Sequence, residues 1–172
     1  MARGYNKRFV SDIERFRNKT DKTINDTRKR LAYDLFSRVV DRTPVYFAYE
    51  KTSGNTKHNW RCSIGSISTG VLVGTDQKGE TTKARMLNVL QRVKGDESIF
   101  FANSVPWIFH LEDGLYPKNP TFGSYNRQAK EYEIRSVGGF SKQAPKGMVK
   151  LTLAEYPHIY RQALKKAQQE NR

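Results

Sequence analysis

The strongest constraint in this sequence is an apolar stripe with helical spacing that begins near Phe9 and ends before Thr43-Pro44. The stripe is carried by Phe9, Ile13, Phe16, Ile24, Leu31, Leu35 and Val39, and widened by Ala32, Phe36 and Val40. Ser11 and Glu14 have the spacing of a capping box, and Pro44 cannot continue a helix. The sequence therefore predicts a helix from Ser11 to about Asp41, preceded by a basic, poorly ordered arm over residues 1–10.

The length of this helix limits how the chain can fold. Unbroken from Ser11 to Arg42, it would be roughly 48 Å long at about 1.5 Å per residue, which is more than a compact domain of this size needs. The segment 18–21 (Asn-Lys-Thr-Asp) offers a point where it could divide in two. Because the stripe is sparse before Leu31 and dense after it, we expect the second half to pack on the core and the first half to reach outward.

Shorter elements follow the long helix. Alternation predicts strands over residues 59–66 and 71–73, an apolar run predicts a third over 98–103, and helical spacing predicts a helix over 82–93. Residues 106–112 favour a short helix, and residues 147–169 a helical segment with either a bend or a new start at Pro157. The predicted fold class is α+β, with a small antiparallel sheet packed by the long N-terminal helix, the middle helix and the C-terminal helix.

At 172 residues the chain is expected to form one domain over residues 11–172. Turn-rich sequence at about 115–140 has the character of an insertion, in which residues 131–137 alternate like an added strand. The single cysteine, Cys62, cannot form a disulfide within the chain and fits a reducing cytoplasm. We expect no signal peptide, because the basic N-terminus is not followed by an apolar run, and no window is apolar enough for a membrane span.

Charge is the most unusual property of the composition. Lys and Arg number 31 against 17 Asp and Glu, a net charge of +14. Such a surface favours an acidic partner, whether nucleic acid, an acidic protein face or an anionic membrane, although it also fits a solvated surface with no such partner. The run Arg28, Lys29 and Arg30 could lie along phosphates, or it could be an ordinary solvated face of the helix.

Three aromatic residues interrupt the polar loop that follows Pro44. Tyr46, Phe47 and Tyr49 share this loop with Glu50, Lys51 and Gly54. Two interpretations stay open: the loop folds back over the core as a lid, or it contacts a neighbouring subunit.

The sequence nominates no catalytic, metal-binding or cofactor-binding residue. The three histidines lie about fifty residues apart with no partner at metal-ligand spacing, and Cys62 has the position of a buried, inert thiol. Glu112 and Asp113 are adjacent, so they share no helix face and are expected to form ion pairs with Lys or Arg. No phosphate loop, dinucleotide fingerprint or nucleophile elbow is present, so we expect the chain not to be an enzyme.

A short stretch before the C-terminal helix has the pattern of a docking elbow. Ala144 and Pro145 favour an extended approach, Gly147 frees the backbone, and Met148 begins the apolar stripe of the last helix. We expect this elbow to set where the C-terminal helix lies, with Met148 in the core.

The sequence resembles the tail-completion, or neck, proteins of tailed bacteriophages over roughly residues 31–164. The most specific match is the block 141–150, Ser-Lys-Gln-Ala-Pro-Lys-Gly-Met-Val-Lys. Four weaker blocks match in the same order: Arg-Thr-Pro-Val at 42–45, Ser-Gly-Asn at 53–55 before Trp60, Thr-Lys-Ala-Arg at 82–85, and Asn-Ser-Val-Pro-Trp at 103–107 before Leu-Glu-Asp-Gly at 111–114. In the family the Leu-Glu-x-Gly element runs almost directly into the Ser-x-Gln-Ala-Pro-x-Gly-Met-Val-Arg block, whereas here about 25 residues, from Leu115 to Phe140, lie between them.

The resemblance implies a structural virion protein of the head–tail junction, made in the host cytoplasm. It implies a cyclic ring of six or twelve copies that contacts neck, connector or tail-tube proteins and the double-stranded DNA that passes through. We expect no membrane partner and no cofactor. A ring of identical subunits needs two different patches per subunit. We place one at the Tyr46-Phe47-Tyr49 loop or the insertion, represented by Tyr116 and Phe122, and the other at the basic first helix with Arg28, Lys29 and Arg30. The alternative is a basic nucleic-acid-binding module that acts as a monomer or dimer.

Overall fold

The computed structural model describes residues 2–45, 53–126 and 129–171. The helices are α1 (Ala2–Arg42), α2 (Asn55–His58), α3 (Glu80–Arg92), α4 (Ile108–Asp113), α5 (Val149–Ala154) and α6 (Tyr156–Glu170). The strands are β1 (Arg61–Ile64), β2 (Ile99–Ala102), β3 (Ser124–Asn126), β4 (Glu131–Glu133), β5 (Ser136–Val137) and β6 (Phe140–Ser141). They form three antiparallel pairs, β1–β2, β3–β4 and β5–β6. The predicted α+β class with small antiparallel sheets is therefore confirmed.

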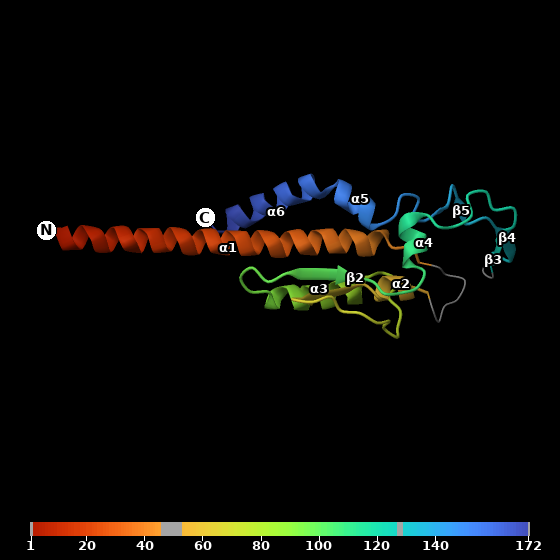
Figure 1. Ribbon diagram of the computed structural model, residues 1–172, viewed down its shortest axis with the longest axis horizontal. Helices are drawn as coiled ribbons and strands as arrows, with labels where there is room; N and C mark the ends of the chain where they lie inside the picture. Colours follow the sequence, from red (N-terminus) through yellow and green to blue (C-terminus); the bar gives the residue numbers. More distant parts are fainter. Residues whose placement is uncertain (1, 46–52, 127–128, 172) are drawn as a thin grey trace.

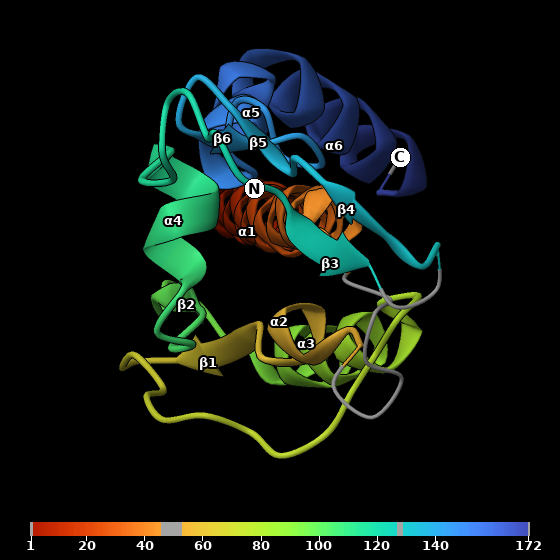
Figure 2. The same cartoon turned by 90° about the vertical axis from the view of Figure 1, so that its right-hand side faces the viewer.

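Helix α1 is the spine of the molecule. Its C-terminal half lies between two layers, with α5 and α6 on one side and β1, β2 and α3 on the other (Figures 1 and 2). Its N-terminal half projects from the end of these layers without a neighbouring element (Figure 1). The dense part of the apolar stripe explains this division, because only that part presents enough apolar surface to hold two layers.

The structure corrects two predictions about α1. The helix begins at Ala2, so residues 2–10 are a continuation of it rather than a poorly ordered arm, and it passes through residues 18–21 without a break. Neither Gly nor Pro occurs between residues 5 and 43, so no residue in that stretch forces an interruption. The 41 residues of α1 span about 60 Å at about 1.5 Å per residue.

Three stacked aromatic rings join α1 to the β1–β2 layer. The Phe101 ring of β2 lies between Phe36 of α1 and Trp60, with centroid distances of 4.2 and 4.7 Å and interplanar angles of 7° in both pairs. The Trp60 indole N–H donates to the Thr43 hydroxyl at 2.7 Å, and that hydroxyl donates to the Val39 carbonyl at 2.7 Å. Thr43 thus caps the end of α1 and also satisfies the buried indole.

Helix α6 packs on α1 through small side chains. Ile159, Ala163 and Ala167 are fully buried and recur every four residues along one face of α6. Alanine at two of these three positions lets the two helix backbones approach closely. Pro157 lies in the first turn of α6, so the proline begins a new helix after α5, which is one of the two outcomes predicted for it.

The other predicted elements are present with one exception. Helices α3 and α4 and strands β1 and β2 fall within or close to their predicted ranges. Residues 71–73, predicted as a strand, are not one. Instead, the Leu72 N–H donates to the Asn59 side-chain oxygen at 2.6 Å, and the Asn59 amide donates to the Leu72 carbonyl at 3.2 Å. A buried asparagine therefore supplies the hydrogen bonds that a second strand would have supplied.

The insertion is closed at its base by backbone hydrogen bonds. Tyr116 N–H donates to the Gly139 carbonyl at 2.9 Å, and Gly138 N–H donates to the Lys118 carbonyl at 3.0 Å. The added strand predicted over residues 131–137 is present only as β4 and β5, two short strands in separate pairs. These hydrogen bonds hold the two ends of the insertion together, so the chain leaves the core and returns to it at one place.

Replacing Ala163 with leucine tests the close approach of α6 to α1. The added methylenes have no space in a fully buried position, so we expect the free energy of unfolding to fall by about 1–3 kcal/mol. Urea unfolding followed by circular dichroism measures it. The matched control is Ala84→Leu at an exposed position of α3, which should change stability by less than about 0.5 kcal/mol. Equal effects at the two positions would contradict the tight α1–α6 contact.

Candidate functional site: an interaction surface and its anchor

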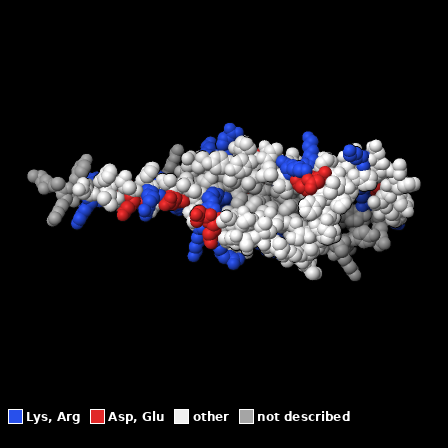
Figure 3. Space-filling model, in the orientation of Figure 1, with Lys and Arg blue, Asp and Glu red and all other residues white. Residues whose placement is uncertain are grey.

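The projecting half of α1 is a surface with apolar residues and no covering element. Every described side chain from residue 6 to residue 22 is exposed. Phe9, Ile13, Phe16 and Ile24 lie along one face with spacings of four, three and eight residues, and Phe16 is 70% exposed. Lys, Arg, Asp and Glu side chains are interspersed along the same projection (Figure 3). We call residues 6–24 the free half of α1.

The predicted basic cluster marks the point where α1 leaves the body of the protein. Arg28 donates to the carbonyls of Gly95 and Glu97, the second at 2.6 Å. Lys29 reaches the Gln91 carbonyl at 3.5 Å, and Arg30 forms an ion pair with Glu170. These contacts tie α1 to the end of α3, the following loop and the end of α6, so the three side chains do not form a free row of charges.

The structure separates the other predicted interface residues. Tyr46, Phe47 and Tyr49 lie outside the described residues. Tyr116 is half-buried and meets the His110 ring edge-on at 5.6 Å, and burial raises the pKa of its hydroxyl. Phe122 is 89% exposed and precedes β3 in the insertion. Figure 1 shows β3 and β4 at the end of the molecule opposite the N-terminus of α1. The insertion and the free half of α1 thus lie at opposite ends of the molecule and are two different surfaces, which is what a head-to-tail interface requires.

The elbow residues are structural, as predicted. Met148 is fully buried, Ala144 is buried, and Pro145 lies at the surface between them. Gly147 has a φ of 73°, and a Cβ there would lie 2.7 Å from the Glu112 carbonyl oxygen. Position 147 therefore accepts only glycine, for both conformational and steric reasons.

Glu112 holds the elbow by capping α5. Its carboxylate accepts hydrogen bonds from the backbone N–H groups of Met148 at 2.7 Å, Val149 at 2.9 Å and Lys150 at 2.8 Å. A helix start has unpaired N–H groups and a partial positive charge, so a carboxylate satisfies both needs. The neighbouring Asp113 pairs with the Lys150 ammonium at 2.6 Å. The predicted ion pairing thus holds for Asp113, whereas the hydrogen bonds of Glu112 are to backbone.

Sequence reasoning missed the role of Glu112 because its partners lie 36 to 38 residues further along the chain. One signal was present. Met148 occupies the N-cap position of α5, where Ser, Thr, Asp or Asn usually provides a local cap. A helix start without a local cap needs one from elsewhere in the fold.

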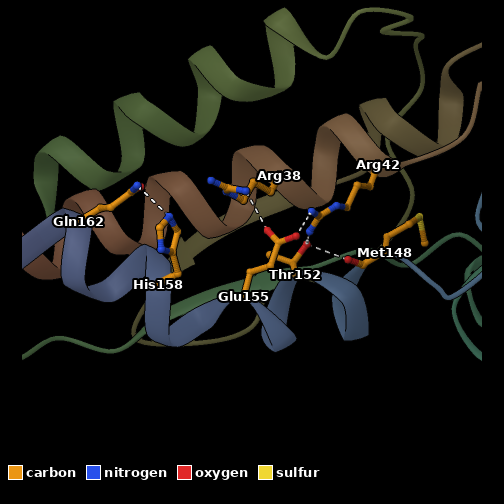
Figure 4. A network of polar contacts seen from close by, with 7 residues as sticks. All are labelled: Arg38, Arg42, Met148, Thr152, Glu155, His158 and Gln162. Atoms are coloured by element: carbon orange, nitrogen blue, oxygen red, sulfur yellow. Dashed lines mark hydrogen bonds and ion pairs between the residues drawn. The ribbon is translucent and has the colours of Figure 1, made fainter.

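A polar network continues from the elbow to α1 (Figure 4). The Thr152 hydroxyl donates to the Met148 carbonyl at 2.8 Å and accepts from the Arg42 guanidinium at 2.7 Å. Glu155, at the junction of α5 and α6, accepts from Arg42 at 2.6 Å and from Arg38 at 2.8 Å. The hydrogen bond from Arg42, followed by the charges of both arginines, lowers the pKa of Glu155. The network fixes both C-terminal helices against the last two turns of α1.

The described residues contain little that resembles reactive chemistry. No group of three His, Cys, Asp or Glu among them could hold a metal ion. Burial raises the pKa of the Cys62 thiol to about 11, which keeps it protonated near neutral pH. Among the same residues, no helix is long and apolar enough to cross a membrane.

Comparisons with known proteins give no further guide to the function of these surfaces. No protein-family model, curated protein or solved structure matches the chain.

Replacing Glu112 with alanine leaves three backbone N–H groups of the elbow without their acceptor. We expect the free energy of unfolding to fall by about 1–3 kcal/mol, as for other lost charge-assisted hydrogen bonds. Asp113→Ala is the matched control, because it removes only an exposed ion pair, for which we expect at most about 1 kcal/mol. Chemical denaturation measures both. A larger loss for Asp113→Ala than for Glu112→Ala would refute the capping role.

The Glu155 network predicts a specific pH dependence. The folded-state pKa of Glu155 lies below its ordinary value of 4.5, so its contribution to stability is complete above that value and is lost as the pH falls through the folded-state pKa. Between about pH 6 and about pH 3 the wild type should therefore lose more melting temperature than Glu155→Gln. Glu131→Gln, at an exposed position, serves as the control and should follow the wild type. Parallel curves for wild type and Glu155→Gln would rule the network out as a stabilising feature.

Proposed function

We propose that this protein is a structural subunit of the head–tail junction of a tailed bacteriophage, a neck or tail-completion ring of six or twelve copies. The observation that carries the proposal is the free half of α1, whose apolar face has no covering element among the described residues. An apolar surface of this extent on a projecting helix is typical of a protein that is completed by a neighbour. The role is assembly, and no chemical step is assigned to the chain.

The resemblance to neck proteins supports the proposal from an independent direction. Several of its motif residues have structural tasks: Trp60 stacks in the core, Glu112 caps α5, and Gly147 and Met148 form the elbow. The motifs therefore describe one way of docking the C-terminal helices onto α1. Residues that serve a fold in this way fit a family whose members share a scaffold and differ in their surfaces.

Energetic considerations favour association through the free half of α1. Fully burying one Phe or Ile side chain contributes up to about 1.5–3 kcal/mol. Association costs an estimated 4–15 kcal/mol in lost freedom. Burial of one apolar side chain cannot offset even the lowest estimate of this cost, whereas burial of all the apolar residues of the free half can. We therefore expect the full stripe to be covered in the assembly. The insertion at the other end of the molecule offers a different patch, which a ring with heterologous contacts needs.

Size measurements on the purified protein test this proposal. Light scattering and particle imaging should give a particle of six or twelve subunits, either alone or after addition of neck partners. Ile13→Asn combined with Phe16→Asn should abolish that particle without lowering the melting temperature, because both side chains are exposed in the single chain. Arg15→Asn is the matched control and should leave the particle intact.

The alternative function gives a different set of results. A basic nucleic-acid-binding module would remain a monomer or dimer, bind duplex DNA with an affinity that falls steeply with salt, and ignore neck components. The net charge of +14 is the property that keeps this alternative open. Such results would replace the ring proposal with the nucleic-acid-binding one.

A further inference from the structure

A hollow of about 290 Å³ lies between β1 and α3. Arg61 of β1 and Arg85 and Arg92 of α3 line it, together with apolar side chains that include Leu72 and Val89. Arg85, Val89 and Arg92 are spaced by four and three residues, so they lie on one face of α3. The volume is near the lower end of the range for ligand-binding pockets.

The guanidinium groups are held in place by only part of their hydrogen-bonding capacity. Arg61 donates one Nη to the Ser68 hydroxyl at 3.2 Å, and Arg85 donates one Nη to the His58 carbonyl. The Nε and second Nη of Arg61 and the Nε of Arg85 are buried without a hydrogen-bond partner. Buried donors of a charged group are costly to leave unpaired, so the two guanidinium groups have hydrogen-bonding capacity that an acceptor would satisfy if the side chains turn toward the hollow.

Within the part of the chain that the structure describes, no carboxylate forms an ion pair with these arginines. None of the residues that line the hollow is acidic. The nearby Asp76 is committed to the start of α3, where it accepts from the Gly79 and Thr82 N–H groups at 2.7 Å each. Burial is the main cause of a lowered pKa at Arg85, with Asp76 opposing the shift and Arg61 adding to it.

The shape of the hollow and its apolar floor, formed by Leu72 and Val89, favour a peptide carboxylate over the phosphates of a DNA duplex. Guanidinium groups bind both carboxylates and phosphates through paired N–H donors. A DNA duplex carries its phosphates on the outside of a wide rod and cannot place them over an apolar floor. An acidic side chain on a peptide can enter the hollow, and an apolar neighbour in the same peptide can cover Leu72 and Val89.

We propose that the Arg61–Arg85–Arg92 hollow is a binding site for an acidic peptide segment of a partner protein, in which a carboxylate meets the guanidinium groups and an adjacent apolar side chain covers the floor. The site is separate from the free half of α1. It does not depend on which assembly the protein belongs to.

Fluorescence anisotropy with a labelled peptide tests the site in the full-length protein at an ionic strength of about 0.15 M, where long-range attraction to the net charge is screened. The probe is Gly-Leu-Glu-Phe-Asp-Gly with blocked ends, and its control is the same peptide with Gln and Asn in place of Glu and Asp. We expect the acidic peptide to bind at least about tenfold more tightly than the amide peptide. Equal affinities, or no binding of either peptide, would overturn the proposal.

Variants of the protein locate the binding. Arg61→Gln with Arg85→Gln should weaken acidic-peptide binding at least about tenfold, since each loses a charge-assisted pair of donors. Asn88→Glu adds a carboxylate at an exposed rim position, so it should block the site without the risk to folding that a buried change carries. Lys165→Gln, exposed on α6, matches Asn88→Glu in net charge, and Lys165→Gln with Lys166→Gln matches the double arginine variant. Both controls should bind like the wild type.

Two results would contradict the site. Unchanged peptide binding in Asn88→Glu would show that the peptide binds elsewhere. A labelled DNA duplex that loses affinity in Arg61→Gln with Arg85→Gln, while the acidic peptide is unaffected, would assign the arginines to phosphate instead.

Discussion

The structure depends on the burial of one half of a single helix between two layers. The C-terminal half of α1 contributes Val39, Val40 and Phe36 to the same core that holds Trp60 and Met148 (Figure 2). The other elements are short: α5 and α6 form one layer, and the small β1–β2 sheet belongs to the other. Neither layer provides a second large element on which the rest of the chain could fold. A two-stranded sheet and two amphipathic helices are marginal by themselves, so each layer is stabilised mainly by its contact with α1.

The two layers are fixed to α1 by different physical means. The β1–β2 layer uses stacked rings and the Trp60–Thr43 hydrogen bond, which are contacts of high directionality in an apolar setting. The C-terminal layer uses small residues for close approach and the Arg42–Glu155 network for position. Glu112 belongs to the second arrangement, because its cap determines where α5 begins. A rigid body of this kind is a suitable base for a projecting helix that must present its apolar face in one direction.

The distribution of paired and unpaired charge gives the surface its functional character. Arg28, Arg30, Arg38 and Arg42 make contacts within the fold, so four of the twelve Lys and Arg residues of α1 serve the structure. The arginines of the hollow between β1 and α3 form no ion pair with a carboxylate among the described residues. The total charge of +14 does not distinguish these two kinds of arginine. The contacts of each arginine distinguish the two kinds: some arginines form ion pairs and hydrogen bonds that hold the fold together, and others have no ion-pair partner among the described residues.

The sequence by itself determined the elements whose causes are local. Apolar spacing along the chain located α1 and α3, and Pro44 and Pro157 marked a helix end and a helix start. The elbow was also readable, since Gly147 and Met148 carry its conformation and its burial. The prediction of a flexible arm at residues 1–10 was wrong, because α1 begins at Ala2. Once a helix is nucleated, residues that favour a helix extend it at little cost in free energy, whether or not they contact the rest of the protein.

Only the tertiary structure decided the interactions between residues far apart in the sequence. Glu112 meets the start of α5, Asn59 takes the hydrogen bonds that residues 71–73 would have given a strand, and Arg61 faces the arginines of α3. The local sequence shows how many hydrogen-bond donors and acceptors a segment has. Which residue pairs with each of them depends on how the distant segments pack together. For the same reason the sequence could propose that the first half of α1 reaches outward, whereas only the structure shows that no other described element covers residues 6–22.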